Sequence, residues 1–283
     1  MCQRGLGLRS FDLGHTPLPM TSEKSNTPSG PEGCCVIPAN ASARSRAKAV
    51  SMALDLPLAA NADAVHGKVA LVVDIDDGWL QVLGPGAPGP IRVDFASPAM
   101  LYRRKGGQNE LLGRAVGVRQ GRRPSVFDAT AGLGRDSFVL ADLGCTVTMA
   151  ERTPALAWLL GTAVERAMVS GEALVRAAAD RLVLWPGDCT TMTLPEGAVL
   201  YLDPMFESQR GSAAVKKDLS ALRLLHGAEP PEEAGEQSLV QWAWAQPCSR
   251  IVVKRAAKAP LLTRNAPSHQ LQGKAVRFDV YVR

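Results

Sequence analysis

The segment Val126–Asp136 constrains the fold more than any other part of the chain. An apolar β-type run ends at Asp128, a turn of small residues containing Gly132 and Gly134 follows, and a helical pattern begins directly afterwards. A strand–turn–helix of this kind brings backbone N–H groups against a cofactor. The dinucleotide pattern G-x-G-x-x-G is incomplete here, which favours a cofactor with a cationic amino-acid end, such as S-adenosyl-L-methionine (SAM). Many glycine turns bind nothing, so the turn by itself leaves a purely structural role open.

Strand and helix patterns alternate from Ser125 to the C-terminus. Apolar runs predict strands at 125–128, 145–150, 182–185, 198–202, 250–254 and 275–282. Helical patterns fill 135–143, 154–168, 171–180, 213–226 and 236–245. The alternation predicts an α/β fold, with a Rossmann-like parallel sheet covered by helices on both faces. No helix precedes the last strand, so we expect it to pair antiparallel at or near an edge.

The N-terminal part of the chain has a different composition. Residues 1–60 are rich in Pro, Ser, Gly and Asn and show no sustained periodicity, which predicts a poorly ordered extension. Short strands at 69–75, 79–83 and 91–95 predict a small β-rich N-terminal module within residues 61–107. A short helix at 108–116 then opens the main domain, expected at 108–283.

Positive charge gathers in front of the first strand of the main domain. Seven basic residues face one acid, Glu110, between Tyr102 and Arg123, whereas the whole chain has a net charge of +5. The seven are Arg103, Arg104, Lys105, Arg114, Arg119, Arg122 and Arg123. This clustering fits contacts to a polyanion such as RNA. A solvated surface beside a loop is the alternative.

The composition disfavours several classes of protein. No apolar run reaches the roughly 18 residues that a membrane span needs, and no apolar segment follows Arg4 and Arg9 as in a secretory signal. The six cysteines contain no C-x-x-C pair, and the four histidines are scattered, so no metal site is indicated. We therefore expect a reduced, cytoplasmic protein that uses no metal.

Polar residues stand at four predicted strand ends, where ligands bind in doubly wound sheets. Arg135 and Asp136 begin the helix after the glycine turn, and Glu151 lies nineteen residues after Gly132. That spacing is close to the roughly 20 residues typical of an acid that binds ribose hydroxyls. Asp188–Cys189 follows the third strand, in a position to meet an adenine edge, and Asp203–Pro204–Met205–Phe206 follows the fourth.

Each of these groups has a structural alternative. Glu151 can begin the next helix with a favourable charge, Asp188 can form a turn, and Asp203–Pro204 can end a strand. The four groups fall in the order and at the strand ends that one site requires. We therefore interpret them together as a SAM pocket.

The segment Asp203–Pro204–Met205–Phe206 also indicates a reaction. An exocyclic base amine is a weak nucleophile because its lone pair is delocalised into the ring. The Asp203 carboxylate and the Pro204 carbonyl can accept its two N–H bonds and aim the lone pair at a methyl group, while Phe206 stacks on the base. A base in a paired region has to be flipped out or already single-stranded.

With these residues the chain resembles the class I SAM-dependent methyltransferases. It resembles more closely the bacterial ribosomal RNA small subunit methyltransferase J family, which methylates the exocyclic N2 of a guanosine in 16S rRNA. The likeness runs from about residue 68 to the end. Besides the glycine turn and Tyr201–Phe206, the matching segments are Val93–Phe95, Arg103–Lys105, Leu143–Cys145, Glu151–Arg152, Lys216–Lys217, Val252–Arg255 and Arg277–Asp279.

The resemblance implies roles for particular residues. It implies contacts with SAM at Arg135, Asp136, Glu151, Arg152, Asp188, Cys189 and Asp203, and the glycine turn itself adds Asp128, Gly132 and Gly134 as expected contacts. Catalytic roles are expected for Asp203, Pro204 and Phe206. Candidate contacts with the substrate, 16S rRNA or the small ribosomal subunit, are Arg103, Arg104, Lys105, Lys216, Lys217 and Lys254.

Other functions stay open at this point. An amino-methyltransferase acting on another RNA or DNA base would carry a similar loop, since Asp-Pro-Met-Phe resembles the Asp-Pro-Pro-Tyr loops of such enzymes. A catalytically idle RNA-binding or assembly factor would keep the fold, although the intact Asp203 and glycine turn count against it. The incomplete G-x-G-x-x-G counts against a nicotinamide dehydrogenase.

Overall fold

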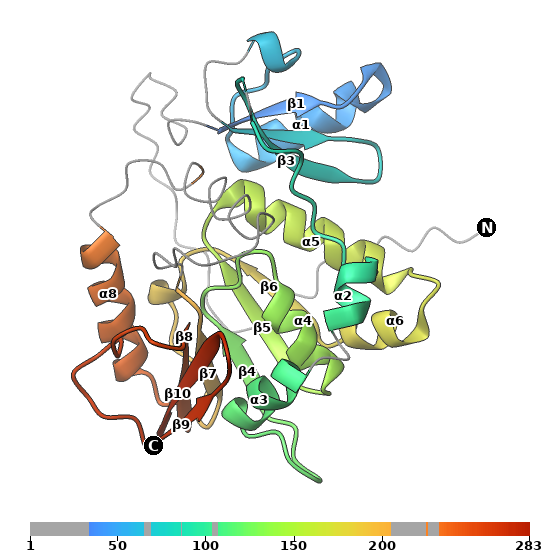
Figure 1. The fold of residues 1–283 in the computed structure, drawn as a ribbon. Helices are drawn as coiled ribbons and strands as arrows, with labels where there is room; N and C mark the ends of the chain where they lie inside the picture. The colour runs from blue at the N-terminus through green and yellow to red at the C-terminus, as the bar shows by residue number, and fades with distance from the viewer. Residues whose placement is uncertain (1–33, 65–68, 86, 104–106, 205–224, 226–231) are drawn as a thin grey trace, which may run out of the picture.

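The computed structural model describes residues 34–64, 69–85, 87–103, 107–204, 225 and 232–283 (Figure 1). These residues form a three-stranded sheet of order β1-β2-β3 and a seven-stranded sheet of order β6-β5-β4-β7-β8-β10-β9. None of the described helices is both long and apolar enough to span a lipid bilayer.

The smaller sheet belongs to an N-terminal module. Its strands are β1 (Cys34–Pro38), β2 (Val69–Val73) and β3 (Gly78–Val82), and β2 pairs parallel with β1 and antiparallel with β3. The helix α1 (Arg44–Leu54) follows β1 after the short helix η1 (Ala41–Ala43), and η2 (Ala62–Ala64) precedes β2. All five residues of β2 are buried, as expected for the central strand of a sheet.

The expectation of a poorly ordered extension up to residue 60 is wrong for residues 34–60, which contain β1 and α1. Their signals are weak because β1 has five residues and α1 buries only Ala47, Val50 and Ser51. The strand expected at 91–95 is also wrong, since Ile91 forms only an isolated bridge with Leu80. The third strand of this sheet is instead β1.

The larger sheet follows the predicted alternation. Its parallel strands are β4 (Ser125–Asp128), β5 (Thr146–Glu151), β6 (Leu182–Pro186), β7 (Val199–Leu202) and β8 (Arg250–Ala256). The last strand, β10 (Val276–Val282), pairs antiparallel with β8, which confirms the expectation for it. Beyond it, the unpredicted edge strand β9 (His269–Gln272) is polar and mostly exposed.

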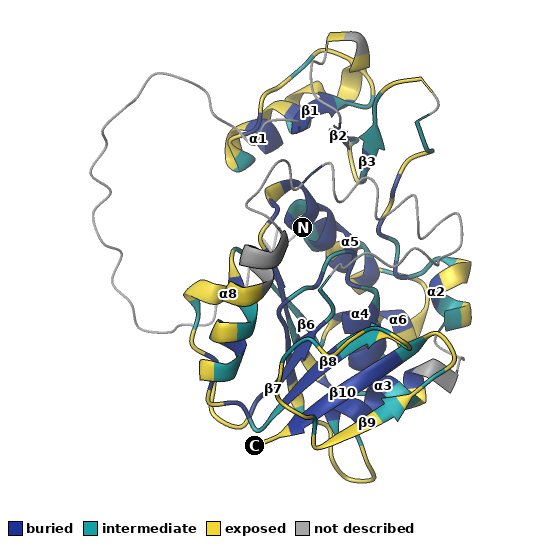
Figure 2. Ribbon diagram, turned by 60° about the vertical axis from the view of Figure 1, so that its left-hand side comes forward, coloured by how far each residue is buried: buried dark blue, intermediate teal, exposed yellow. Residues whose placement is uncertain are grey.

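Helices cover both faces of this sheet (Figures 1 and 2). On one face lie α3 (Gly107–Val116), α4 (Arg135–Asp142), α5 (Pro154–Met168) and α6 (Ala173–Ala179). On the other lie α8 (Glu232–Ala245) and the short η3 (Cys189–Thr191), while α2 (Pro98–Arg103) leads from the module towards the sheet. The predicted helix at 213–226 lies outside the described residues, apart from residue 225.

Alternation along the strands decides which side chains meet. Val199 and Tyr201 of β7 pack into the core on the α4 side, whereas Leu200 and Leu202 pack on the α8 side. Because β7 and β8 pair in parallel with Leu202 opposite Val253, Asp203 and Lys254 leave the sheet side by side. Polar residues from β4, β5, β7 and β8 therefore meet at the carboxyl edge of the sheet.

Candidate active site

The two glycines of the turn after β4 have different structural roles. Both have positive φ angles, +54° at Gly132 and +67° at Gly134. A Cβ atom on Gly134 would lie 2.7 Å from Leu160 Cδ2, so this glycine lets α4 start close to the core. A Cβ atom on Gly132 would have only the Thr130 carbonyl oxygen nearby, at 3.9 Å. The backbone of Gly132 therefore faces open space, where a ligand can approach.

Glu151 at the end of β5 is tied to this turn. Its Oε2 accepts a hydrogen bond from the Gly132 N–H at 3.1 Å, and its Oε1 accepts one from the Thr153 N–H at 2.8 Å. Burial raises the pKa of Glu151, and the bonds from Thr153 and Gly132 oppose that rise. With the Thr153 hydroxyl also bonded to this carboxylate, one lone-pair position is left that can accept a ribose hydroxyl.

The residues after β6 cap the N-terminus of the short helix η3. The Gly187 N–H donates to the Glu151 carbonyl at 2.9 Å, which holds this segment beside β5. Asp188 is exposed and accepts from the backbone N–H and the hydroxyl of Thr190, both at 2.8 Å. Cys189 is buried, and burial followed by the charge of Asp188 raises the pKa of its thiol to about 12. Asp188 thus has the turn-forming role as well as a place beside the predicted pocket.

Asp136 joins three elements at the start of α4. Its Oδ1 forms an ion pair with Arg103 from α2, and its Oδ2 accepts from the Tyr201 hydroxyl and the Lys254 Nζ, each at 2.7 Å. Burial by itself would raise the pKa of Asp136. The charges of Lys254 and Arg103, with hydrogen bonds from Lys254 and Tyr201, outweigh burial and lower this pKa to about 2.

Asp203 shares the same lysine. Lys254 Nζ lies 2.7 Å from Asp203 Oδ2, and the Asp203 backbone N–H donates to Thr130 Oγ1 at 2.7 Å. Burial raises the pKa of Asp203 and the charge of Asp136 adds to the rise, against the opposing effect of Lys254. The Asp203 side chain is still 38% exposed, so one end of the cluster is open to a ligand.

Asp128 lies beneath these groups. It is 2% exposed, accepts from the Thr130 N–H at 3.1 Å, and also accepts from the Ser137 hydroxyl. Burial raises the pKa of Asp128 to about 7, although both hydrogen bonds oppose the rise. At neutral pH this carboxyl group is therefore partly protonated.

The structure brings most of the predicted residues to one edge of the sheet. Asp128, Asp136, Asp203, Arg103 and Lys254 form a connected cluster, and Gly132 and Glu151 form the adjoining wall. Arg152 is exposed after β5, and Arg135 is half-buried at the start of α4. The predictions for Arg104, Lys105, Phe206, Lys216 and Lys217 lie outside the described residues.

Three residues of the site were not predicted. The Thr130 hydroxyl accepts a hydrogen bond from the Asp203 backbone N–H. The Ser137 hydroxyl donates to Asp128, and the Tyr201 hydroxyl donates to Asp136. Thr130 and Tyr201 fall within segments that the sequence had marked, but their hydroxyls become recognisable only once β4, α4 and β7 are adjacent.

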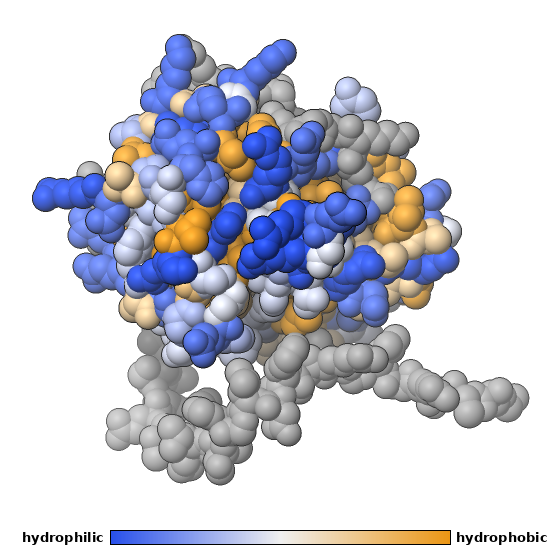
Figure 3. All heavy atoms as spheres, turned by 90° about the horizontal axis from the view of Figure 1, so that it is seen from below, coloured by the Kyte–Doolittle hydropathy of each residue, from blue (hydrophilic) through white to orange (hydrophobic). Residues whose placement is uncertain are grey.

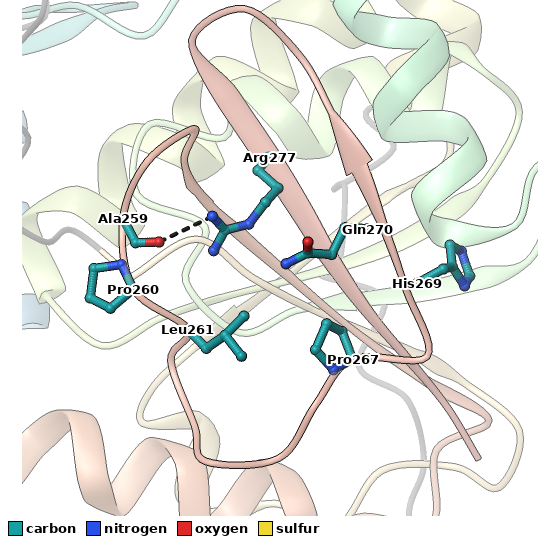
Figure 4. A pocket seen from close by; sticks show the side chains of 7 residues that line it. All are labelled: Ala259, Pro260, Leu261, Pro267, His269, Gln270 and Arg277. Carbon is teal, nitrogen blue, oxygen red and sulfur yellow. Dashed lines mark hydrogen bonds between the residues drawn. The ribbon is translucent and has the colours of Figure 1, made fainter.

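A cavity of about 590 Å³ lies elsewhere, beneath the loop before β9 (Figure 4). It is lined by Ala259, Pro260, Leu261, Pro267, His269, Gln270 and Arg277, none of which was predicted as a site residue. Arg277 is paired with Asp279 and donates to the Ala259 carbonyl at 3.0 Å. Its guanidinium is thus held largely by groups of the chain itself.

Comparison with known proteins identifies the family. A family model described as "Putative SAM-dependent methyltransferase" matches residues 55–283. The Ribosomal RNA small subunit methyltransferase J of Pseudomonas aeruginosa (strain UCBPP-PA14) is 43% identical over 241 residues, which cover 81% of this chain and 86% of that protein. The chain belongs to the ribosomal RNA small subunit methyltransferase J family.

A second curated relative and a crystal structure agree with this assignment. The Ribosomal RNA small subunit methyltransferase J of Dechloromonas aromatica (strain RCB) is 43% identical, over 84% of this chain and 95% of its own. A crystal structure of a SAM-dependent methyltransferase from Neisseria gonorrhoeae aligns with a TM-score of 0.65 and 32% identity, covering 87% of this chain and 95% of that one. The predicted fold, the enzyme class and the cofactor, SAM, are thereby confirmed.

Proposed function

We propose that this protein transfers a methyl group from SAM to the exocyclic N2 of a guanosine in 16S rRNA of the small ribosomal subunit. The observation that carries the proposal is the position of Asp203, held by Lys254 and Thr130 at the carboxyl edge of the sheet, next to the wall formed by Gly132 and Glu151. The name of its relatives, Ribosomal RNA small subunit methyltransferase J, supports the substrate.

The described residues fit SAM. Glu151 offers an acceptor lone pair for a ribose hydroxyl, and Gly132 leaves space for close approach of the ligand to the backbone. We assign Asp188 and Cys189, which follow β6, to the adenine edge, and Arg135, at the start of α4, to the amino-acid end. When bound there, SAM supplies a methyl group made electrophilic by the positive charge on its sulfur.

The chain's own contribution is orientation of the amine. Asp203 Oδ2 is bound to Lys254, while Oδ1 has no hydrogen-bond partner among the described residues and can accept an N–H of the base. The Pro204 carbonyl can accept the second N–H. With both bonds made, the nitrogen lone pair is directed at the methyl carbon instead of into the ring.

The transfer balances without a further reactant. The N2–carbon bond forms as the sulfur–carbon bond breaks, and the electron pair of the broken bond stays on sulfur, which becomes uncharged. The proton lost from N2 passes to Asp203 or to water. Asp203 suits this role because its pKa is raised, whereas Asp136 keeps its charge and holds Lys254 in place.

A ribosomal RNA substrate agrees with the cytoplasmic location that we expect from the cysteines. The five cysteines among the described residues are all free and buried. In the described part of the chain Arg103 is engaged with Asp136, so we assign it to the active site. A direct contact with RNA remains our proposal for Arg104, Lys105, Lys216 and Lys217.

The test is methylation of unmodified 16S rRNA with methyl-labelled SAM, followed by digestion to nucleosides. Free transcript and reconstituted small subunits are both offered as substrate. We expect label in N2-methylguanosine at one position with at least one of them. Label in N6-methyladenosine or N4-methylcytidine would support instead the amino-methyltransferase alternative, and label in no nucleoside with either substrate would refute both.

A further inference from the structure

Arginines gather at the amino edge of the large sheet, opposite the active site. Arg123 lies two residues before β4, Arg181 directly precedes β6, and Arg250 begins β8. Arg119 and Arg122 pair with each other in a tight turn, with backbone hydrogen bonds of 3.2 and 2.9 Å. We call these five residues the amino-edge arginines.

The five side chains form one group although their positions span more than 130 residues of the chain. Ser125 pairs opposite Thr146, Val147 opposite Leu182, and Val199 opposite Arg250, so the strands start level with one another. Burial lowers the pKa of Arg250, and the neighbouring charges of Arg122 and Arg119 lower it further. The view from this edge shows strongly hydrophilic side chains gathered on its surface (Figure 3).

Several of these guanidinium groups are held in place by the backbone. Arg123 donates to the carbonyl of Arg119 at 2.6 Å, and Arg250 donates to the carbonyl of Ala115 at 2.8 Å. Arg181 donates to the carbonyl of Ala177 at 2.6 Å. A guanidinium fixed by one or two carbonyls keeps further N–H groups for an anion and loses less entropy when it binds one.

No ion pair joins any amino-edge arginine to a carboxylate among the described residues. Asp180 and Glu196 lie at the same edge, but both are exposed and neither forms an ion pair with a described residue. A group of fixed, unpaired guanidiniums attracts a polyanion, with phosphate as its best-matched group.

We infer that the amino-edge arginines bind the phosphate backbone of the RNA substrate at a second surface, separate from the methyl-transfer site. The inference rests on the proposed function for the identity of the polyanion. The two surfaces are about 15 to 20 Å apart, from the rise of the strands between them, so a folded RNA can contact both. The amino-edge contacts carry affinity and orientation, and Asp203 selects the base.

The test compares two double variants with equal changes in charge. Arg119→Gln/Arg122→Gln removes two exposed amino-edge charges, and Arg44→Gln/Lys48→Gln removes two exposed charges from α1 as the matched control. The dissociation constant for unmodified 16S rRNA transcript is measured over a series of KCl concentrations. The slope of log affinity against log salt should fall in magnitude by about 1.4 to 1.8 in the first variant. We expect no such fall in the control.

The remaining readouts separate the possible outcomes. SAM affinity should be unchanged in both variants, and the KM for rRNA should rise in the amino-edge variant at constant kcat. A salt slope equal to that of the control would overturn the inference, as would arginine-dependent binding to phosphatidylglycerol vesicles without an effect on RNA. If RNA binding depends on these arginines but no guanosine is methylated, the second surface stands and the proposed function fails.

Discussion

Asp136 and Asp203 share the ammonium group of Lys254, yet their pKa values shift in opposite directions. Asp136 has Arg103 and the Tyr201 hydroxyl as additional partners, so its negative charge is the better stabilised of the two. Asp203 has no second cation at bonding distance among the described residues. Asp203, the carboxylate that faces the ligand, therefore has the oxygen that is left to react.

Replacing Asp203 tests the orienting role directly. Asp203→Ala should lower the single-turnover rate of methyl transfer by about 100-fold or more, because the amine loses its acceptor. The protein should still fold, since Thr130 binds the backbone N–H of this residue and not its side chain. Asp203→Asn keeps an acceptor oxygen and should retain more activity than the alanine variant. Near-normal rates in Asp203→Ala would refute the mechanism.

Asp128 gives a prediction about stability and pH. Its pKa is about 7 in the folded protein against an ordinary 3.8, so between these values the native state holds more protons than the unfolded state. Its contribution to the free energy of unfolding is therefore lost as pH rises from about 4 to 7. Asp128→Asn should flatten the pH dependence in this window, measured by urea unfolding. Asp180→Asn, at an exposed site, is the control, and equal slopes in wild type and Asp128→Asn would contradict the assignment.

At the scale of elements, the turn between β4 and α4 does two separate things. Gly132 leaves the ligand side open, and Gly134 allows α4 to begin against Leu160 and Phe95. The two glycines look equivalent in the sequence. Only the position of α5, which supplies Leu160, distinguishes them.

Alanine substitutions should separate these two roles. Gly134→Ala combines a left-handed backbone with a contact of 2.7 Å, and should destabilise the fold by about 2 to 4 kcal/mol. Gly132→Ala carries the backbone strain without the clash and should cost about 1 to 2 kcal/mol, with a larger effect on SAM affinity. Urea unfolding and calorimetric titration with SAM measure the two effects. Equal losses of stability would contradict the distinction.

Elements with a strong pattern were predictable from the sequence, and elements with a weak one were not. The strands β4, β5, β6, β7, β8 and β10 fall within one or two residues of their predicted bounds. The strand β9 was missed because its residues His269–Gln272 are mostly polar and gain their place only by pairing with β10. The strand β1 was missed because five apolar residues in a segment rich in Ser and Pro give no period to detect.

At the scale of the whole molecule, the N-terminal module rests on α5. Gly78 of β3 faces the Trp158 ring so closely that a Cβ atom on it would overlap Trp158 Cζ3. Arg46 of α1 stacks over the same ring, with its guanidinium carbon 5.7 Å from the ring centre. Arg166, also on α5, forms an ion pair with Asp77. One face of α5 thus joins the module to the sheet that holds the site.

Trp158→Ala should loosen this attachment. Removal of the half-buried ring should lower the free energy of unfolding by about 2 to 4 kcal/mol and make the module more sensitive to protease. Trp185→Ala is the control, because Trp185 is 38% exposed on the edge strand β6. Thermal unfolding and limited proteolysis measure both variants. Equal behaviour of the two would show that the contact with α5 does not hold the module.

The alternation of strands and helices after Ser125, the glycine turn and the four polar strand ends were determined by the sequence itself, because each rests on residues that are close together along the chain. Local periodicity and turn residues are sufficient for such features. These residues predicted SAM as the cofactor, which the family model then confirmed, and the resemblance to methyltransferase J added the substrate class.

Only the tertiary structure decided how distant residues combine. The basic cluster between Arg103 and Arg123 is continuous in the sequence, but Arg103 lies at the carboxyl edge and Arg119, Arg122 and Arg123 lie at the amino edge. The sharing of Lys254 by two carboxylates likewise depends on strand register and on the α4 start, which bring together residues up to 118 positions apart. Electrostatic interactions act through space, so their partners are set by the packing of the sheet and not by order along the chain.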